Sequence, residues 1–440
     1  MPLSRSLLIN RDHARLWYGQ AVSTVGDYVF DTTLVLWVAT VLARGRSWAP
    51  AAVSGILLAV GAAVLLVGPV AGVFVDRWNR RATMLRTEVV RAVLVTVLLL
   101  LSLLPTGALP IWLWLTVIYL VVFVLNAAGQ FFSPARFATV GDVVDGEADR
   151  AWAAGIGQAT AATASIVGPP LAAPLLFTVG IQWALLANVV TYVVSYVAIR
   201  SVRAPHAMVV TGAAQDQAGS TIRAEFAAGL RFFRRNRFLV ALVSITVIAA
   251  CGDGALSALD VFFVTDNLHA SSRLYGLMSM AFGVGAILGS LWAARVVRWF
   301  GTRSTTWLGL VVAGVLVFGY ARQTAFPAGL VLLALVSIPV AMLNTAMTPL
   351  LPDSTPPQYL GRMIAVFNPI NRLASMLSVV AAGWLASTVL HGFTATVVGT
   401  HIGPIDTIFA TAGILIVLAG VYACLALPRQ APGPAPTTPG

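Results

Sequence analysis

Apolar residues run along this chain in long blocks that short polar segments separate. A helix needs about 20 apolar residues to cross the hydrocarbon core of a bilayer, and the blocks reach that length. We place about twelve of them, which begin near residues 15, 50, 82, 110, 150, 181, 238, 272, 303, 327, 361 and 402. The pattern therefore predicts an all-α membrane protein with twelve transmembrane helices and little chain left for soluble domains.

Two segments interrupt this pattern and set the predicted domain boundaries. In residues 201–237 a polar stretch with Pro205, Gly212, Gln215, Asp216 and Gln217 precedes an arginine-rich one from Glu225 to Arg237. This change predicts a cytoplasmic linker between an N-terminal six-helix bundle (1–200) and a C-terminal six-helix bundle (238–428). Residues 429–440 consist mostly of Pro, Gly, Thr and Ala. That composition cannot bury a core, so we expect a disordered tail.

The two predicted bundles repeat each other in sequence. Gly26-Asp27 in the first block recurs as Gly252-Asp253 in the seventh, and Asn126 in the fourth block recurs as Asn344 in the tenth. Two halves built as structural repeats are the architecture of transporters that alternate access to a site near the midplane of the membrane. We therefore expect the two bundles to be related by pseudo-twofold symmetry.

Composition and charge agree with a membrane location. Hydrophobic residues make up 58% of the chain and charged residues 10%, with a mean hydropathy of +0.87, far from the values of soluble domains. The net charge of +11 comes from arginine alone, because the chain has no lysine. Most arginines fall in alternate loops, as the positive-inside rule requires. We expect a multi-pass protein of the bacterial inner (plasma) membrane with both termini cytoplasmic, whose basic residues meet lipid headgroups and not nucleic acid.

The first predicted span carries acids at its centre. Gln20, Asp27 and Asp31 recur at steps that place them on one face of a helix. An ionised carboxylate at that depth costs about 2.5–3.5 kcal/mol, so this face should not meet lipid. The seventh span likewise carries Asp253 and Asp260, of which Asp260 lies nearer the outer end and would alternatively be an external-gate residue.

Acids in such a position suit proton coupling. Removal from water raises the pKa of a carboxylate toward the physiological range, so the group can bind a proton on one side of the membrane and release it on the other. Asp27 is the first candidate for this role and Asp31 the second. The alternative is that Asp27 is structural and is locked to an arginine such as Arg372 across the bundle.

Amides and two arginines interrupt other spans. Arg91 and Arg372 both lie within apolar blocks, and we expect Arg372 to be either a counter-ion to the aspartates or a contact for an anionic substrate. The amides should face a shared cavity, although hydrogen bonds that only hold helices together are an equal alternative for each. The candidate cavity residues are Gln20, Asn126, Gln130, Asp253, Asp260, Asn344, Asn368, Asn371 and Arg372.

A charged turn separates the second and third blocks and reads Gly72-Val-Phe-Val-Asp76-Arg77-Trp-Asn-Arg80-Arg81. Its spacing resembles the signature loop of the major facilitator superfamily of secondary transporters. The resemblance implies the major facilitator fold and a cytoplasmic gate made of these charged residues and Gly72. In that gate the glycine lets a neighbouring helix approach, Asp76 meets the positive end of that helix, and Arg77 and Arg81 bridge to nearby acids. Arginines that only anchor the topology are the alternative.

Shorter motifs narrow the resemblance to one branch. Residues 133–136 (Ser-Pro-Ala-Arg) and 361–363 (Gly-Arg-Met) are similar to the branch that contains the enterobactin exporter and macrolide-efflux permeases. Gly168, Pro169 and Pro170 resemble the Gly-Pro element of superfamily antiporters that export. Proline there would bend the helix and glycine would permit close packing.

These observations predict proton-coupled export of a small amphipathic or lipophilic compound, such as a drug or macrolide, by a monomer that is not an enzyme and needs no cofactor or metal. A phosphate-binding loop of the Gly-x-x-x-x-Gly-Lys type requires lysine, so this chain alone cannot drive transport with ATP. A siderophore exporter is the second hypothesis and nutrient uptake the third. A non-transporting sensor on the same fold is a further alternative, although the loops and tail are too short for a signalling domain.

Overall fold

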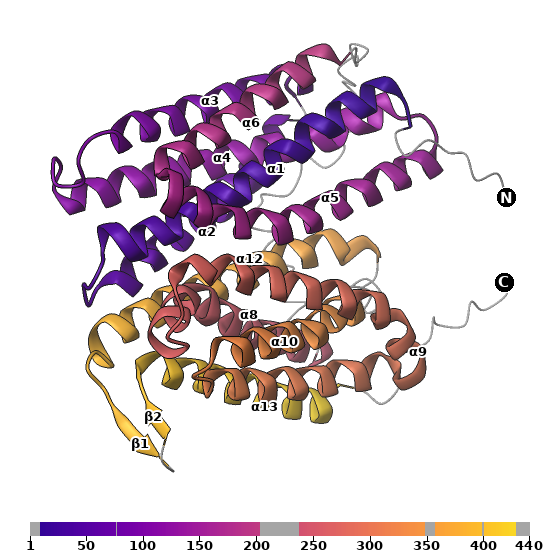
Figure 1. Ribbon diagram of the computed structural model, residues 1–440. Helices are drawn as coiled ribbons and strands as arrows, with labels where there is room; N and C mark the ends of the chain where they lie inside the picture. The colour runs from indigo at the N-terminus through magenta and orange to yellow at the C-terminus, as the bar shows by residue number, and fades with distance from the viewer. Residues whose placement is uncertain (1–8, 76, 203–236, 348–356, 398–399, 428–440) are drawn as a thin grey trace, which may run out of the picture. The chain divides into compact units, whose positions relative to one another are not determined.

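The computed structural model describes residues 9–75, 77–202, 237–347, 357–397 and 400–427. These residues are helical apart from turns and one two-stranded hairpin (Figure 1). The chain divides into two compact units, of which one comprises Met1–Ala214 with Ser271–Met280 and the other Gln215–Ala270 with Ala281–Gly440. Most of the predicted linker and tail lies outside the described residues.

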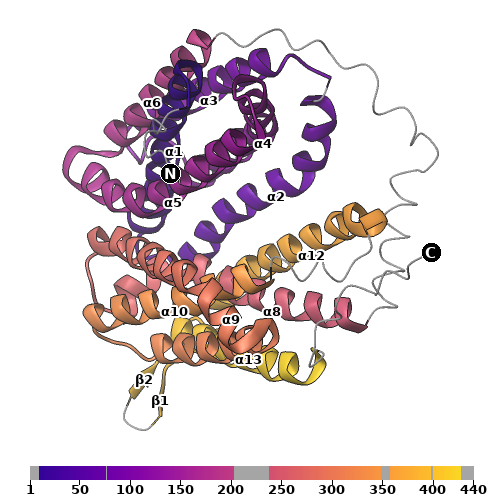
Figure 2. The same ribbon diagram turned by 90° about the vertical axis from the view of Figure 1, so that its right-hand side faces the viewer.

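Long helices build the first unit. They are α1 (Arg11–Trp37), α2 (Ala49–Val75), α3 (Arg80–Ser102), α4 (Ile111–Val143), α5 (Glu147–Pro174) and α6 (Ile181–Ser201). π-Helical turns, Val38–Leu42 and Leu175–Val179, follow α1 and α5. α6 packs against both α1 and α3, and α4 packs against α2 and α3 (Figures 1 and 2). Side chains from α1, α3 and α6 can therefore meet inside this bundle.

The second unit follows the same plan with different details. It contains α8 (Arg237–Phe262), most of α9 (Tyr275–Ala321), α10 (Phe326–Met347), α12 (Pro357–Trp384) and α13 (Pro404–Ala426). α8 ends in the π-helical turn Phe263–Asn267, α12 ends in another at Leu385–Val389, and the short 3-10 helix Ser272–Leu274 precedes α9. α8 packs against α12 and α13.

α9 is two helical segments joined at Gly301. This residue has φ 75° and ψ 158°, a left-handed conformation that glycine adopts without the steric cost of a Cβ atom. The helix direction therefore breaks there, close to the position where the sequence predicts that a new span begins.

Ten of the described helical segments are long and apolar enough to cross a membrane. α9 counts once among them despite its break, and α3 is not among them, because its sequence carries Arg80, Arg81, Arg86, Glu88 and Arg91. The helical, multi-pass membrane architecture is confirmed in the part of the chain that the structure describes. The number of twelve spans stays a prediction.

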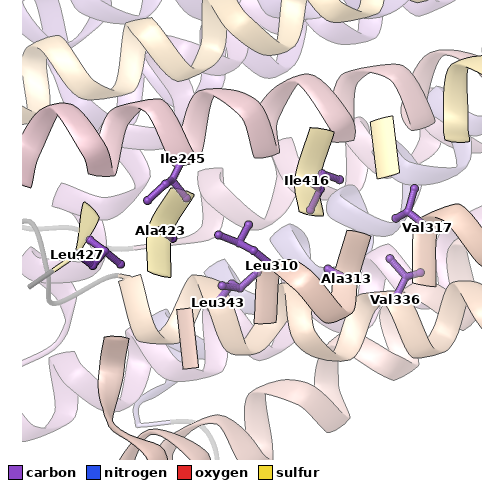
Figure 3. Close-up of a cluster of buried hydrophobic side chains, with 9 residues drawn as sticks. All are labelled: Ile245, Leu310, Ala313, Val317, Val336, Leu343, Ile416, Ala423 and Leu427. Carbon is purple, nitrogen blue, oxygen red and sulfur yellow. The ribbon is translucent and has the colours of Figure 1, made fainter. Parts of the chain in front are cut away.

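Close helix packing holds the core of the second unit together. Apolar side chains from α8, α9, α10 and α13 form one buried cluster (Figure 3). Gly314 of α9 and Gly413 of α13 lie next to this cluster. A Cβ atom on Gly314 would be 2.6 Å from the carbonyl oxygen of Gly413, and a Cβ atom on Gly413 would be 2.8 Å from the carbonyl oxygen of Gly314. The two backbones approach because neither residue has a side chain. The cluster residues are Ile245, Leu310, Ala313, Val317, Val336, Leu343, Ile416, Ala423 and Leu427.

Two short paired strands before α13 depart from helix in the described part of the chain, and the sequence analysis did not predict them. β1 (Ala395–Val397) pairs antiparallel with β2 (Thr400–Ile402), with Ala395 opposite Ile402. The segment is rich in threonine and valine, which favour strands, but it is too short to stand out beside apolar blocks of span length.

Candidate functional site

A chain of polar side chains joins α1, α3 and α6 inside the first unit. Gln20 Nε2 on α1 donates a hydrogen bond to Ser195 Oγ on α6 (2.8 Å), and Ser195 Oγ in turn donates to Glu88 Oε1 on α3 (2.7 Å). One turn away, the hydroxyl of Tyr192 donates to Asp27 Oδ1 (2.6 Å). Ser195 and Tyr192 are fully buried and Glu88 is 1% exposed, so these contacts exclude water.

Arg91 on α3 lies beside this network. Its guanidinium is 5.2 Å from the ring centroid of Phe132 on α4 and 5.8 Å from that of Tyr192, distances at which aromatic faces attract a cation. A Cβ atom on Gly129 would lie 2.6 Å from Arg91 Nη2, so a glycine at that position of α4 makes room for the arginine. Arg91 is thus held on the α4 side of the network.

The network holds more acid than base. Arg91 lies within electrostatic range of Asp27, Glu88 and Asp31. Arg136 on α4 is a further cation near Arg91, but Arg91 is the cation that acts on the carboxylates of Asp27 and Glu88. When both carboxylates are ionised beside one arginine, the group keeps one excess negative charge, and an unpaired buried charge costs several kcal/mol.

The predicted coupling acids differ in exposure. Asp27 is half-buried between α1 and α6, whereas Asp31, one turn further along α1, is exposed. Asp31 nevertheless lies within electrostatic range of Asp27 and Arg91, so the two aspartates and the arginine belong to one group. Within the first unit, Arg91 is the cation in electrostatic range of Asp27. Arg372 belongs to the other unit, so the alternative that pairs it with Asp27 stays a prediction.

Sequence reasoning did not assign four members of this network: Glu88, Arg91, Tyr192 and Ser195. A signal for the first two was present, since a glutamate and an arginine three residues apart in an apolar block meet the same criterion that selected Asp27. The hydroxyl groups of Tyr192 and Ser195 gave no comparable signal, because single hydroxyls are common in membrane helices.

The acids of the second unit occupy separate places. Asp253 on α8 is exposed and lies within electrostatic range of Arg372 on α12, whose Nε is buried and without a hydrogen-bond partner among the described residues. Asp260 is half-buried, and its Oδ1 accepts a hydrogen bond from the hydroxyl of the buried Tyr320 (2.8 Å). The structure therefore groups Asp253 with Arg372 and Asp260 with Tyr320.

Two of the predicted cavity amides bond to their own helices. Asn126 Nδ2 donates to the carbonyl of Val122 (2.9 Å), and Asn371 Nδ2 donates to that of Phe367 (2.9 Å). Gln130 lies against α2, because a Cβ atom on Gly68 would be 3.2 Å from its Oε1. Asn344 and Asn368 are both exposed.

The charged turn after α2 is described only in part, since Asp76 lies outside the described residues. Arg80 Nη1 forms an ion pair with Asp142 at the end of α4, at 2.8 Å from Oδ1 and 2.7 Å from Oδ2. Arg81 instead donates to the backbone carbonyl of Arg200, although the resemblance assigned it to an acid. Arg77 is exposed, and a Cβ atom on Gly72 would meet nothing within 4 Å.

The Gly-Pro-Pro segment lies inside α5. A Cβ atom on Gly168 would be 2.6 Å from Cβ of Tyr28 on α1, so the glycine lets α5 approach α1. Pro169 and Pro170 follow it within the helix, and the π-helical turn comes directly after α5. In the described part of the chain, no group of three or more His, Cys, Asp or Glu side chains could hold a metal ion.

Comparison with known proteins extends over nearly the whole chain. The family model of the Major Facilitator Superfamily matches residues 16–260 and 242–440. The MFS-type transporter YkuC of Bacillus subtilis (strain 168) is 22% identical over 433 residues, which cover 96% of this chain and 93% of YkuC. Macrolide efflux protein A of Streptococcus pyogenes is 23% identical over 382 residues, which cover 85% of this chain and 89% of that protein.

A solved structure shares the fold at low identity. The crystal structure of a bacterial homologue of the iron transporter ferroportin, in its inward-facing state, superposes with a TM-score of 0.70. The superposition covers 95% of this chain and 98% of the ferroportin homologue, at 14% sequence identity. This likeness extends to the fold of both units and carries no information on the substrate.

Proposed function

The chain belongs to the Major Facilitator Superfamily, and we propose that within this family it exports a small amphipathic or lipophilic compound by alternating access, driven by protons. The family consists of transporters, so the prediction of a multi-pass membrane transporter that is not an enzyme is confirmed. The resemblance to the macrolide-efflux branch is also confirmed. Proton coupling, substrate and direction are what we propose beyond this.

One arrangement supports the proton coupling: Asp27, bonded to the hydroxyl of buried Tyr192, and Glu88, bonded to that of buried Ser195, lie in one network inside the first unit with Arg91 as the nearby cation. Ionising both acids beside one cation leaves a buried charge without a partner, and breaking a buried pair in this way costs about 3–5 kcal/mol. Binding a proton removes that cost. The cluster therefore supplies a group that gains or loses a proton with its surroundings, and we propose that protons reach Asp27 through Asp31, which is exposed one turn further along α1.

Export is supported by resemblance and by local packing. Macrolide efflux protein A is named for efflux and aligns over 85% of this chain. Gly168 lets α5 pack closely on α1, which carries Asp27. We propose that α5 at Gly168, Pro169 and Pro170 follows α1 when that helix moves.

We also propose roles for the remaining predicted residues in a cytoplasmic gate and along the substrate path. Arg80 ties the start of α3 to Asp142 at the end of α4. We propose that this ion pair, with Gly72, Asp76, Arg77 and Arg81, forms the cytoplasmic gate, and that the amides line the path of the substrate. The proposed substrate-path residues are Gln20, Asn126, Gln130, Asp253, Asp260, Asn344, Asn368, Asn371 and Arg372.

The proposed topology has twelve spans, because α9 breaks at Gly301 and α3 is long enough to cross with Glu88 and Arg91 buried inside the bundle. Both termini would then be cytoplasmic, in the plasma membrane of a bacterium. A monomer suffices for this proposal, since each buried network lies within one chain.

Reconstituted vesicles test the coupling. Wild-type protein should accumulate the macrolide erythromycin when a pH gradient is applied and should move protons as it does so. Asp27→Asn should abolish accumulation while leaving the amount of folded protein unchanged, because the amide cannot bind and release a proton. Asp145→Asn, the same change at an exposed position, is the control. Normal accumulation by Asp27→Asn between about pH 6 and 8 would refute the assignment of Asp27.

A further inference from the structure

The charged turn after α2 has a second copy on α9. Asp76-Arg77-Trp78 in the first copy corresponds to Val297-Arg298-Trp299 in the second, 221 residues later. The second copy thus has the arginine and the tryptophan but not the acid. No Asp or Glu occurs between Asp266 and Asp353. Neither α9 nor α10 therefore carries an acid that could pair with the arginines of this segment.

Two arginines of the second copy lie on the surface of the protein. Arg295 and Arg298 are both exposed, and neither forms an ion pair or a side-chain hydrogen bond with another described residue. The guanidinium of Arg295 lies 5.5 Å from the ring centroid of the exposed Trp292, a distance at which an aromatic face attracts a cation. Arg303, in contrast, donates to the backbone carbonyl of Cys424 on α13. The two exposed arginines are thus available to an anion from outside the chain.

The surface of α9 next to these arginines is apolar. Leu288 and Leu291 are exposed, and the face that they form continues to Arg295 and Trp299 at steps of three and four residues. A different face of the helix packs on α10 at Gly289. Because the chain is a multi-pass membrane protein, the exposed leucines meet lipid. The arginines and tryptophans therefore lie at the end of a lipid-facing surface, next to the break of α9.

The corresponding side chains of the first copy have partners within the first unit. Trp78 stacks on Phe131 of α4, with ring centroids 5.8 Å apart and an interplanar angle of 16°, and Arg80 pairs with Asp142. Trp299 is 68% exposed and makes no ring contact with another described residue. The first copy is therefore satisfied by the protein itself, whereas the second presents basic and aromatic groups to its surroundings.

We propose that Arg295 and Arg298, with Trp292 and Trp299, bind the headgroup of an anionic phospholipid. Residues three apart on a helix are neighbours on its surface, so both guanidinium groups can reach one phosphate, whose oxygens match their N–H donors. Tryptophan rings are typical of the headgroup level of a membrane, and the exposed leucines lie along the acyl chains. The proposal depends on the membrane location of the chain and not on its transport activity.

Native mass spectrometry of the purified full-length protein tests this site. The protein is released from detergent micelles that contain phosphatidylglycerol and phosphatidylcholine in equal amounts. Wild type should retain a molecule of phosphatidylglycerol in preference to phosphatidylcholine, whose headgroup has no net charge. Arg295→Gln together with Arg298→Gln should lower this preference by about 10–30-fold, since each arginine near an anionic headgroup contributes about fivefold. Arg44→Gln together with Arg46→Gln, which removes two exposed arginines from the turn between α1 and α2, should keep the preference.

Two further measurements separate the parts of the site. Trp292→Leu keeps both charges but removes the ring beside Arg295, so the preference should fall by about two- to fivefold. An excess of inorganic phosphate should leave the lipid bound, because phosphate has no acyl chains to lie on α9. Equal retention of the two lipids by wild type, or an unchanged preference in the variant without Arg295 and Arg298, would overturn the proposal. Displacement of the lipid by phosphate would show that the site binds the anion alone and would overturn the assignment to a phospholipid.

Discussion

Replacing Arg91 by methionine tests the physical basis of the site. Methionine fills a similar length of apolar space but leaves Asp27 and Glu88 without their cation. Arg91 is 9% exposed, so solvent does little to screen its interactions. Removal of one partner from a buried pair costs about 3–5 kcal/mol, and each lost contact with Phe132 and Tyr192 adds about 0.5–2 kcal/mol.

The loss should depend on pH, because the acids can bind protons instead of remaining charged. One pH unit corresponds to about 1.36 kcal/mol for each proton bound. We therefore expect Arg91→Met to lose about 3–5 kcal/mol of stability at about pH 8 and roughly 1–2 kcal/mol at about pH 5. The variant has fewer ionised acids at low pH, so the loss shrinks as the pH falls.

Unfolding in mixed detergent micelles, followed by circular dichroism, measures these differences. Adding Asp27→Asn to Arg91→Met removes one of the unpaired acids, so the double variant should regain about 1–3 kcal/mol at about pH 8. Arg86→Met is the matched control, since Arg86 is an exposed arginine on the same helix. A loss that is equal at both pH values, or a double variant no more stable than Arg91→Met, would refute the charge argument.

Two further predictions concern packing and the gate. Gly314→Ala should destabilise the protein by about 1–3 kcal/mol in the same unfolding assay, because the new Cβ atom meets the backbone of Gly413. Gly319→Ala is the control on the same helix: its Cβ atom would have no neighbour within 4 Å, so the change should be neutral or slightly stabilising. Equal effects of the two changes would contradict the close approach of α9 and α13. Arg80→Gln removes the half-exposed ion pair with Asp142 and should cost less than about 1 kcal/mol of stability. It should nevertheless lower transport into vesicles severalfold relative to the control Arg86→Gln. Equal transport by the two variants would show that the Arg80–Asp142 pair is not part of the gate.

The helical architecture could be predicted from the sequence because the bilayer fixes the length of each apolar block. The break at Gly301 illustrates this, since the predicted start of a span near residue 303 lies beside the one residue of α9 with a left-handed backbone. The hairpin at Ala395–Ile402 could not be found in this way. Its two strands have three residues each, and no solvent constraint of similar strength sets their length.

The site could be predicted only in part. Asp27 could be predicted as a candidate because an acid within an apolar block is energetically costly whatever surrounds it. Its neighbours could not be predicted, because the positions of Tyr192 and Arg91 near Asp27 depend on how α6 packs against both α1 and α3. The hydrophobic pattern does not encode which helices contact one another. Arg372 shows the same limit, since its neighbour Asp253 is distant in sequence and lies on α8.

The two halves repeat in sequence but differ in how they use the equivalent acid. Asp27 lies within the first bundle, where α3 supplies an arginine and α6 a tyrosine hydroxyl. Asp253 is exposed and lies near Arg372. A buried acid has a charge that its neighbours must balance, so its protonation can move helices, whereas water can balance the charge of an exposed acid. The repeat therefore supplies the position of the acid, and because of the helices that surround Asp27 we propose that proton coupling belongs to the first half.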